Sequence, residues 1–125
     1  MQYINHLIRF FLGSLFLIAG LNKVFEFMKP MEFSGGAQKM VSVIMQSGYL
    51  WETIAAVEII GGMLLISSYF VPLGLAVLAP VVLNIVLFHL YLDANGLILS
   101  FVLAFFEGYL IYIYREKFAV FFIAR

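Results

Sequence analysis

The sequence contains no cysteine among its 125 residues. This absence excludes disulfide exchange, thiolate catalysis and cysteine-ligated iron–sulfur clusters as functions of the chain alone. It also excludes, as mechanistic models, the small four-helix membrane enzymes that pass electrons to a quinone through a cysteine pair. The sequence has no phosphate-cradling glycine loop, nucleophile elbow or metal-protease motif either. These motifs therefore identify no catalytic residue, and the catalytic residues stay unknown.

Charged residues are also scarce. They make up 11% of the chain, against about 25% in soluble domains. Acidic and basic residues balance to zero net charge at pH 7, which argues against a nucleic-acid partner held through its phosphates. In their place the chain is 65% hydrophobic, with a mean hydropathy of +1.09. A soluble fold of this length could not bury so much apolar surface, so the sequence predicts an integral membrane protein with the lipid bilayer as a partner.

Four apolar stretches are each long enough to cross a hydrocarbon core about 30 Å thick. In lipid a segment must satisfy its own backbone hydrogen bonds, so each stretch is expected to be a helix. Proline is expected to break the chain at Val71-Pro72, and Asp93–Gly96 is a good turn sequence. We therefore predict an all-α, four-helix transmembrane bundle, one domain over residues 1–125 with both termini on one side. The predicted helices span about residues 3–21, 50–70, 71–92 and 97–114.

The long connection between the first two spans contains a further helical pattern. Ala37–Ser47 places its polar residues on one narrow arc, with apolar residues around the remainder and glycines beyond both ends. This pattern predicts a short interfacial helix on the bilayer, and the apolar tail Phe118–Ile123 is expected to lie on the surface in the same way. A lid over the mouth of the bundle is the functional alternative for Ala37–Ser47. Trp51 and the tyrosines near the helix ends are assigned to an aromatic belt.

The distribution of basic residues bears on orientation. The side of the termini carries a slight excess of lysine and arginine, so the positive-inside rule favours cytoplasmic termini. The N-terminus runs directly into the first span and has no small-residue cleavage site, so we expect an uncleaved membrane anchor.

The first span carries a polar and small-residue stripe. Its members project within an arc of roughly 80° on a helix with 3.6 residues per turn. Small residues on such a stripe let a neighbouring helix approach closely, and the charges of the stripe then face protein rather than lipid. The pattern is consistent with two interpretations. The stripe can serve helix packing with buried polar groups, or it can form part of a functional site. The stripe consists of Asn5, Arg9, Gly13, Phe16, Gly20 and Lys23.

Charged groups inside the spans are costly, at about 2.5–3.5 kcal/mol each on insertion scales, so we expect them to be paired or to mark a site. Counting about 1.5 Å of rise per residue puts Arg9 and Glu107 at the same depth, roughly 9–10 Å from the side of the termini. Their opposite charges predict a structural Arg9–Glu107 pair, the simplest way to bury both groups.

Glu58 is the leading functional candidate, because it falls near the middle of the membrane. It shares a helix face with Gly62 and Leu65, so a neighbouring helix can pack close beside its carboxyl group. One interpretation is a protonatable group that binds a polar headgroup or relays a proton. The other is a structural acid bonded to Asn84, which is predicted at nearly the same depth, or to Arg9.

His89 and Asp93 are four residues apart on one helix face, where the carboxylate can orient the imidazole. Depth counting places Lys23 and Glu52 level with them. The same spacing could supply two metal ligands, but further suitable ligands are lacking and no metal site is predicted. His6 is expected near the opposite side of the membrane, which argues against bis-histidine haem ligation. An interfacial role and a catalytic or quinone-contacting role both stay open for His89.

These residues resemble the DoxX family of small bacterial membrane proteins. The first span reads RFFLG at Arg9–Gly13 and AGLNK at Ala19–Lys23, similar to the family pattern of Arg, Leu-Gly and Ala-Gly-x-x-Lys. The second span reads EIIGGMLL at Glu58–Leu65, similar to the family pattern Glu-x-x-Gly-Gly-x-x-Leu. The third ends in Phe88-His89, where members often carry a histidine. The resemblance extends from Arg9 to about residue 114.

The resemblance implies a multi-pass protein of the bacterial cytoplasmic (inner) membrane. The family takes its name from a subunit of a membrane complex that oxidises thiosulfate and reduces quinone, and its relatives are linked to redox complexes. We therefore expect a non-catalytic subunit with no covalent cofactor, which binds a quinone or other lipophilic molecule and serves a redox partner protein, and which can form homo-oligomers. A non-enzymatic membrane scaffold is one alternative, and a small transporter or proton pathway through Glu58 and Glu107 is another. The candidate ligand-binding or proton-relay residues are Glu58, Arg9, Asn84, His89, Glu107 and Lys23.

Overall fold

The computed structural model describes residues 2–119 as a helical bundle, with no β-strand in this range. Four segments are long and apolar enough to cross a membrane, which confirms the predicted all-α, four-helix transmembrane fold and a multi-pass membrane protein. The fourth of these segments joins α5 to the short 3₁₀ helix η1 that precedes it. The helices that form these four segments are α1 (Gln2–Phe25), α3 (Leu50–Ser67), α4 (Val71–Tyr91), η1 (Ala94–Gly96) and α5 (Leu97–Ile113).

Two helix ends differ from the prediction. α1 continues beyond residue 21 to Phe25, so Lys23 projects from regular helix; the chain then leaves the helix at Glu26, which has a φ of 52°. α3 ends at Ser67 rather than at residue 70, because Ser68 and Phe70 adopt left-handed backbone conformations that do not continue a helix. Pro72 consequently lies in the first turn of α4, where its missing N–H costs no hydrogen bond.

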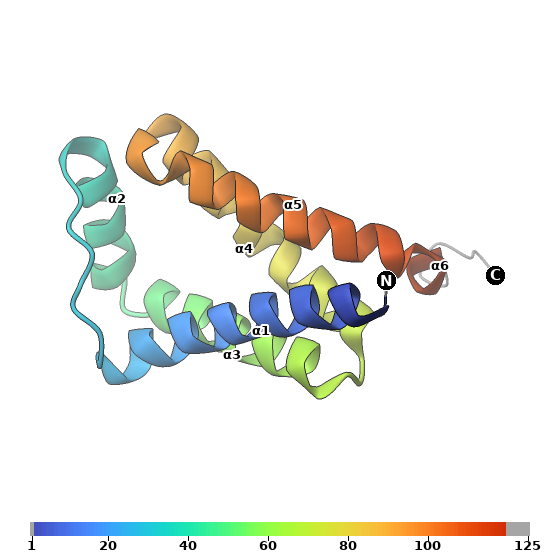
Figure 1. Cartoon of the computed structure of the whole chain (residues 1–125). Helices are drawn as coiled ribbons and strands as arrows, with labels where there is room; N and C mark the ends of the chain where they lie inside the picture. Colours follow the sequence, from blue (N-terminus) through green and yellow to red (C-terminus); the bar gives the residue numbers. More distant parts are fainter. Residues whose placement is uncertain (1, 120–125) are drawn as a thin grey trace.

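The most extensive contact between spans is that of α1 with α3, which lie side by side (Figure 1). The stripe predicted on α1 forms the contact with α3. A Cβ atom on Gly62 would lie 2.6 Å from the carbonyl oxygen of Gly13, and one on Gly20 would lie 2.8 Å from that of Ala55. Glycine therefore lets the two backbones meet, as expected of small-residue stripes in membranes. α4 packs about equally against α3 and α5, and α5 makes a smaller contact with α1.

The core of the bundle is a column of aliphatic side chains contributed by all four spans. Only 22–28% of each span is buried inside the molecule, and the remaining helix surface is predominantly apolar. An apolar outer surface of this extent is stable in lipid rather than in water. The fully buried large side chains are Leu12, Phe16, Leu65, Leu75, Leu78 and Leu110.

The predicted helix in the long connection is confirmed as α2 (Gly35–Gln46). Its axis runs across the ends of the spans, as an interfacial helix should (Figure 1). Just before α2, Phe33 makes an edge-to-face contact with Phe88 of α4, at a centroid distance of 5.3 Å. The other end of α2 leads into α3 through Ser47, whose hydroxyl accepts a hydrogen bond from the Leu50 N–H. The segment from Phe33 to Leu50, which includes α2, thus extends across the mouth of the bundle from α4 to α3.

The opposite end of the bundle carries the start of α1 and the short helix α6 (Arg115–Phe118), in agreement with the prediction that the termini share one side (Figure 1). The tail predicted at Phe118–Ile123 lies, from residue 120 onward, outside the described residues.

Candidate functional site

The most deeply buried ion pair of the described chain joins α1 to α3. The Lys23 Nζ lies 3.1 Å from Glu58 Oε1 and 3.0 Å from Glu58 Oε2, and Glu58 is only 3% exposed. In a helix each side chain leans toward the N-terminus of its own helix. Because α1 and α3 are antiparallel, Lys23 leans into the membrane while Glu58 leans back toward it, and the two groups meet.

This ion pair corrects two expectations for Glu58. The carboxylate is bonded neither to Asn84 nor to Arg9, the two partners that its predicted depth indicated. Lys23 was placed near the membrane surface by the position of its Cα atom, but its four-carbon side chain reaches about one helical turn further inward. Depth counting on Cα positions cannot include this reach.

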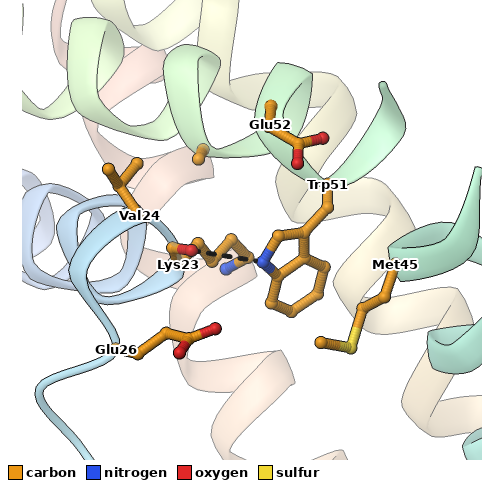
Figure 2. Close-up of a pocket in the computed structure, with 7 residues that line it drawn as sticks. Lys23, Val24, Glu26, Met45, Trp51 and Glu52 are labelled. Carbon is orange, nitrogen blue, oxygen red and sulfur yellow. Dashed lines mark hydrogen bonds between the residues drawn. The ribbon is translucent and has the colours of Figure 1, made fainter. Parts of the chain in front are cut away.

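A cleft of about 370 Å³ adjoins the ion pair (Figure 2). It lies where α1 ends and α3 begins, beside the last turn of α2. Trp51 is its central side chain: its indole Nε1–H donates a hydrogen bond to the Lys23 carbonyl oxygen at 3.3 Å, and the Lys23 Nζ lies 5.3 Å from the centre of its ring. In the view of Figure 2, Trp51 lies between Lys23 and Met45. The lining residues are Lys23, Val24, Glu26, Met45, Trp51, Glu52 and Ala55.

The charges around the cleft are mainly negative. Glu26 and Glu52 line it with exposed side chains, and the positive charge of Lys23 is offset by Glu58 behind it. Lys23 and Glu52, which were expected at the same depth in the membrane, both line this cleft. The aromatic belt accounts for the position of Trp51 along the membrane normal, but not for its contacts. A partly buried indole N–H needs a hydrogen-bond acceptor, and this need could have indicated from the sequence that Trp51 contacts a neighbouring segment.

Arg9 caps the end of α3. Its Nη1 donates to the carbonyl oxygen of Leu65 and, at 3.4 Å, to that of Ile66, while its Nη2 lies 3.2 Å from His6 Nδ1. The last carbonyl groups of a helix lack partners within the helix and form its negative end. A buried guanidinium satisfies both needs, so the geometry assigns Arg9 a structural role.

The predicted Arg9–Glu107 pair is wrong. Arg9 directs its donors to α3 and to His6, and neither carboxylate oxygen of Glu107 has a hydrogen-bond partner in the described part of the chain. Glu107 is nevertheless 4% exposed and lies on the buried face of α5. The hydrogen bond that does join α1 to α5 runs from the Tyr109 hydroxyl to Asn5 Oδ1, at 2.7 Å.

The remaining candidates lie apart from the cleft. Asn84 is exposed, and its Nδ2 donates to the carbonyl oxygen of Pro80 in its own helix at 3.1 Å. The predicted His89–Asp93 pair is confirmed: His89 Nδ1 lies 3.1 Å from Asp93 Oδ2. The imidazole packs over Gly96, where a Cβ atom would lie 2.3 Å from the ring. The two residues fasten the end of α4 to the following turn and do not line the cleft.

The DoxX family model matches residues 4–90. The matched range contains the stripe of α1, the ion pair and the whole lining of the cleft; it ends before Asp93 and Glu107. No curated protein and no solved structure matches the chain.

Proposed function

Because the chain belongs to the DoxX family, we propose that it is a non-catalytic membrane subunit that binds a quinone, or a lipophilic molecule with a similar headgroup, for a redox partner protein. Its place would be the cytoplasmic membrane of a bacterium. The observation that carries the proposal is the cleft at Lys23 and Trp51, next to a buried ion pair.

The dimensions and lining of the cleft suit a single small ring. Its volume of about 370 Å³ is at the lower end of the range found for small-molecule sites, roughly 300–1,000 Å³. Trp51 and Met45 offer an aromatic face and a polarizable thioether as apolar contacts. The Lys23 ammonium has three N–H donors, of which Glu58 engages two. The third is available to a carbonyl oxygen of the ligand.

The charges of the cleft favour a neutral headgroup over an anionic one. A phosphate or carboxylate headgroup would meet the carboxylates of Glu26 and Glu52, while Lys23 is already paired with Glu58. A neutral carbonyl group accepts a hydrogen bond without this repulsion. The location also fits, since the end of α1 and the start of α3 lie where a span meets the headgroup region. These features support a quinone-like ligand rather than a phospholipid headgroup.

The single tryptophan of the chain allows a direct test. A short-chain ubiquinone analogue titrated into the protein in lipid nanodiscs should quench the fluorescence of Trp51 saturably. The Met45→Phe variant fills the cleft and should weaken binding about tenfold, which corresponds to about 1.4 kcal/mol. Met40→Phe is the matched control, because Met40 is similarly exposed on α2 and does not line the cleft. Quenching that never saturates, or that Met45→Phe leaves unchanged, would contradict the proposal.

The preference of the cleft for a neutral headgroup can be measured separately. A quinone analogue with a carboxylate on its ring should bind more weakly than the neutral analogue. The double variant Glu26→Gln/Glu52→Gln should strengthen binding of the charged analogue severalfold and leave that of the neutral one unchanged. Both side chains are exposed, so the variant should fold normally. If neither analogue binds, the ion pair and its surroundings serve only to hold the helices, and the scaffold alternative holds.

A further inference from the structure

The bundle buries two glutamates to the same extent and provides a cation for only one. Glu58 is 3% exposed and Glu107 is 4% exposed. Both oxygens of Glu58 accept hydrogen bonds from Lys23, whereas neither oxygen of Glu107 has a partner in the part of the chain that the structure describes. Glu107 lies on the buried face of α5, on the same stripe as Ser100, Leu103 and Leu110.

The helices that pack against α5 supply no cation to Glu107. On α1, Arg9 is bonded to α3 and to His6, and Lys23 is bonded to Glu58. On α4, His89 is bonded to Asp93 at the far end of the span. On α6, Arg115 donates to the Tyr112 carbonyl oxygen and Lys117 lies over the Tyr114 ring. The ionisable groups of these elements and of α5 itself are Tyr3, His6, Arg9, Lys23, His89, Tyr91, Tyr109, Tyr112, Arg115, Glu116 and Lys117, and η1 has none.

A carboxylate anion is poorly tolerated in such a place. Without water, a cation or a hydrogen-bond donor, nothing offsets the loss of its hydration on entering an apolar interior. A neutral carboxylic acid carries no net charge and is far less costly to bury. The contacts of the two buried glutamates therefore favour different protonation states: the carboxylate for Glu58 beside Lys23, and the neutral acid for Glu107.

We propose that Glu107 is a proton-binding site in the interior of the bundle, which holds a carboxylic-acid proton in the folded protein, whereas the paired Glu58 is a carboxylate. The ligand of this site is a proton, and the site is separate from the cleft at Lys23 and Trp51. The inference does not depend on the proposed quinone function, because no residue is shared between the two sites.

A hydrophobic carbodiimide distinguishes the two states chemically. Dicyclohexylcarbodiimide partitions into lipid and reacts with protonated carboxyl groups there. The acid proton moves to a carbodiimide nitrogen, and a carboxyl oxygen bonds to the central carbon to form an O-acylisourea. Transfer of the acyl group from oxygen to nitrogen then gives a stable N-acylurea. No group leaves, so the labelled peptide gains the mass of one whole carbodiimide.

The test is labelling of the full chain in lipid nanodiscs, with the modified residue located by peptide mass spectrometry. We expect label on Glu107, loss of that label to background in Glu107→Gln, and undiminished label in Glu58→Gln. Labelling of Glu107 should fall as the buffer is made alkaline. Glu116→Gln is the control for an exposed carboxylate. Glutamine has the shape of the neutral acid, so Glu107→Gln should keep the elution profile and the unfolding midpoint of the wild type.

Infrared spectroscopy provides a measurement that needs no access for a reagent. The carbonyl stretch of a protonated carboxyl group should be present in the wild type and in Glu58→Gln, and absent in Glu107→Gln. A wild-type spectrum without this band, or a band that Glu107→Gln leaves intact, would overturn the proposal. So would carbodiimide label found on Glu58 in place of Glu107.

Discussion

Lys23 is the residue on which the geometry of the cleft depends. It pairs with Glu58 through its ammonium group, accepts the indole hydrogen bond of Trp51 on its carbonyl oxygen, and is one of the residues that line the cleft. The two members of the ion pair are nevertheless unequal. The side chain of Lys23 is 19% exposed and lies beside the cleft, whereas that of Glu58 is 5% exposed and lies deeper.

This inequality predicts an asymmetric response to mutation. Lys23→Met leaves Glu58 buried without a cation and should lower the free energy of unfolding by about 3 kcal/mol or more. Glu58→Gln should cost roughly 1–2 kcal/mol, because the long Lys23 side chain can turn toward water. Unfolding in mixed detergent micelles measures both values. The double variant Lys23→Met/Glu58→Leu should recover most of the loss, since no charge stays buried. Equal costs for the two single variants would contradict this account.

At the scale of elements, the contact between α1 and α3 depends on glycine. Sequence periodicity predicted which face of α1 meets protein, because residues three and four apart lie on one side of a helix. It also predicted that a neighbouring helix packs on the face of Gly62, but it could not identify that neighbour as α1 or predict the contact with Ala55 and the last carbonyl groups of α3. Arg9 illustrates the difference: its position on the stripe was predictable, but its acceptors are backbone atoms, which no residue pattern reveals.

The close approach of these two helices predicts a matched pair of substitutions. Gly62→Ala would place a Cβ atom 2.6 Å from the Gly13 carbonyl oxygen and 2.8 Å from the Leu17 nitrogen. Since both are backbone atoms, the helices must separate, at a cost of about 1–3 kcal/mol. Gly108→Ala on α5 meets nothing within 4 Å and should be neutral or stabilising by up to about 1 kcal/mol. Unfolding in mixed micelles compares the two variants. If Gly62→Ala and Gly108→Ala change the free energy of unfolding by similar amounts, helix propensity rather than close packing explains the effect.

Across the whole molecule, the four spans share one core and α2 lies across one mouth of the bundle. α2 contributes Met45 to the cleft, and Phe33 just before α2 contacts Phe88 of α4. This arrangement makes one end of the bundle covered and polar. The other end carries the turn between α3 and α4 together with α6.

The natural absence of cysteine makes this topology directly measurable. Single cysteines at Ser34 and Asn95 should react with a membrane-impermeant thiol reagent from one side of the membrane, and cysteines at Tyr69 and Lys117 from the other. All four side chains are exposed in loops or short helices at the ends of the spans. The side that labels Lys117→Cys also decides whether the termini are cytoplasmic, as the slight excess of basic residues predicts. Only α5 separates Asn95 from Lys117. If both cysteines react from the same side, α5 does not cross the membrane and the predicted topology is wrong.

Hydropathy and residue spacing were enough to predict the four spans, the helix in the long connection, the inward face of α1 and the His89–Asp93 pair. All of these depend on hydropathy and on spacing within one helix, which are local properties. Three features became visible only in the folded chain: Lys23 neutralises Glu58, Arg9 caps α3, and Glu107 has no hydrogen-bond partner among residues 2–119. The physical reason is that residue counting fixes depth along the membrane normal. It does not fix the rotation of each helix, the reach of a long side chain, or the position of backbone carbonyl groups at a neighbouring helix end.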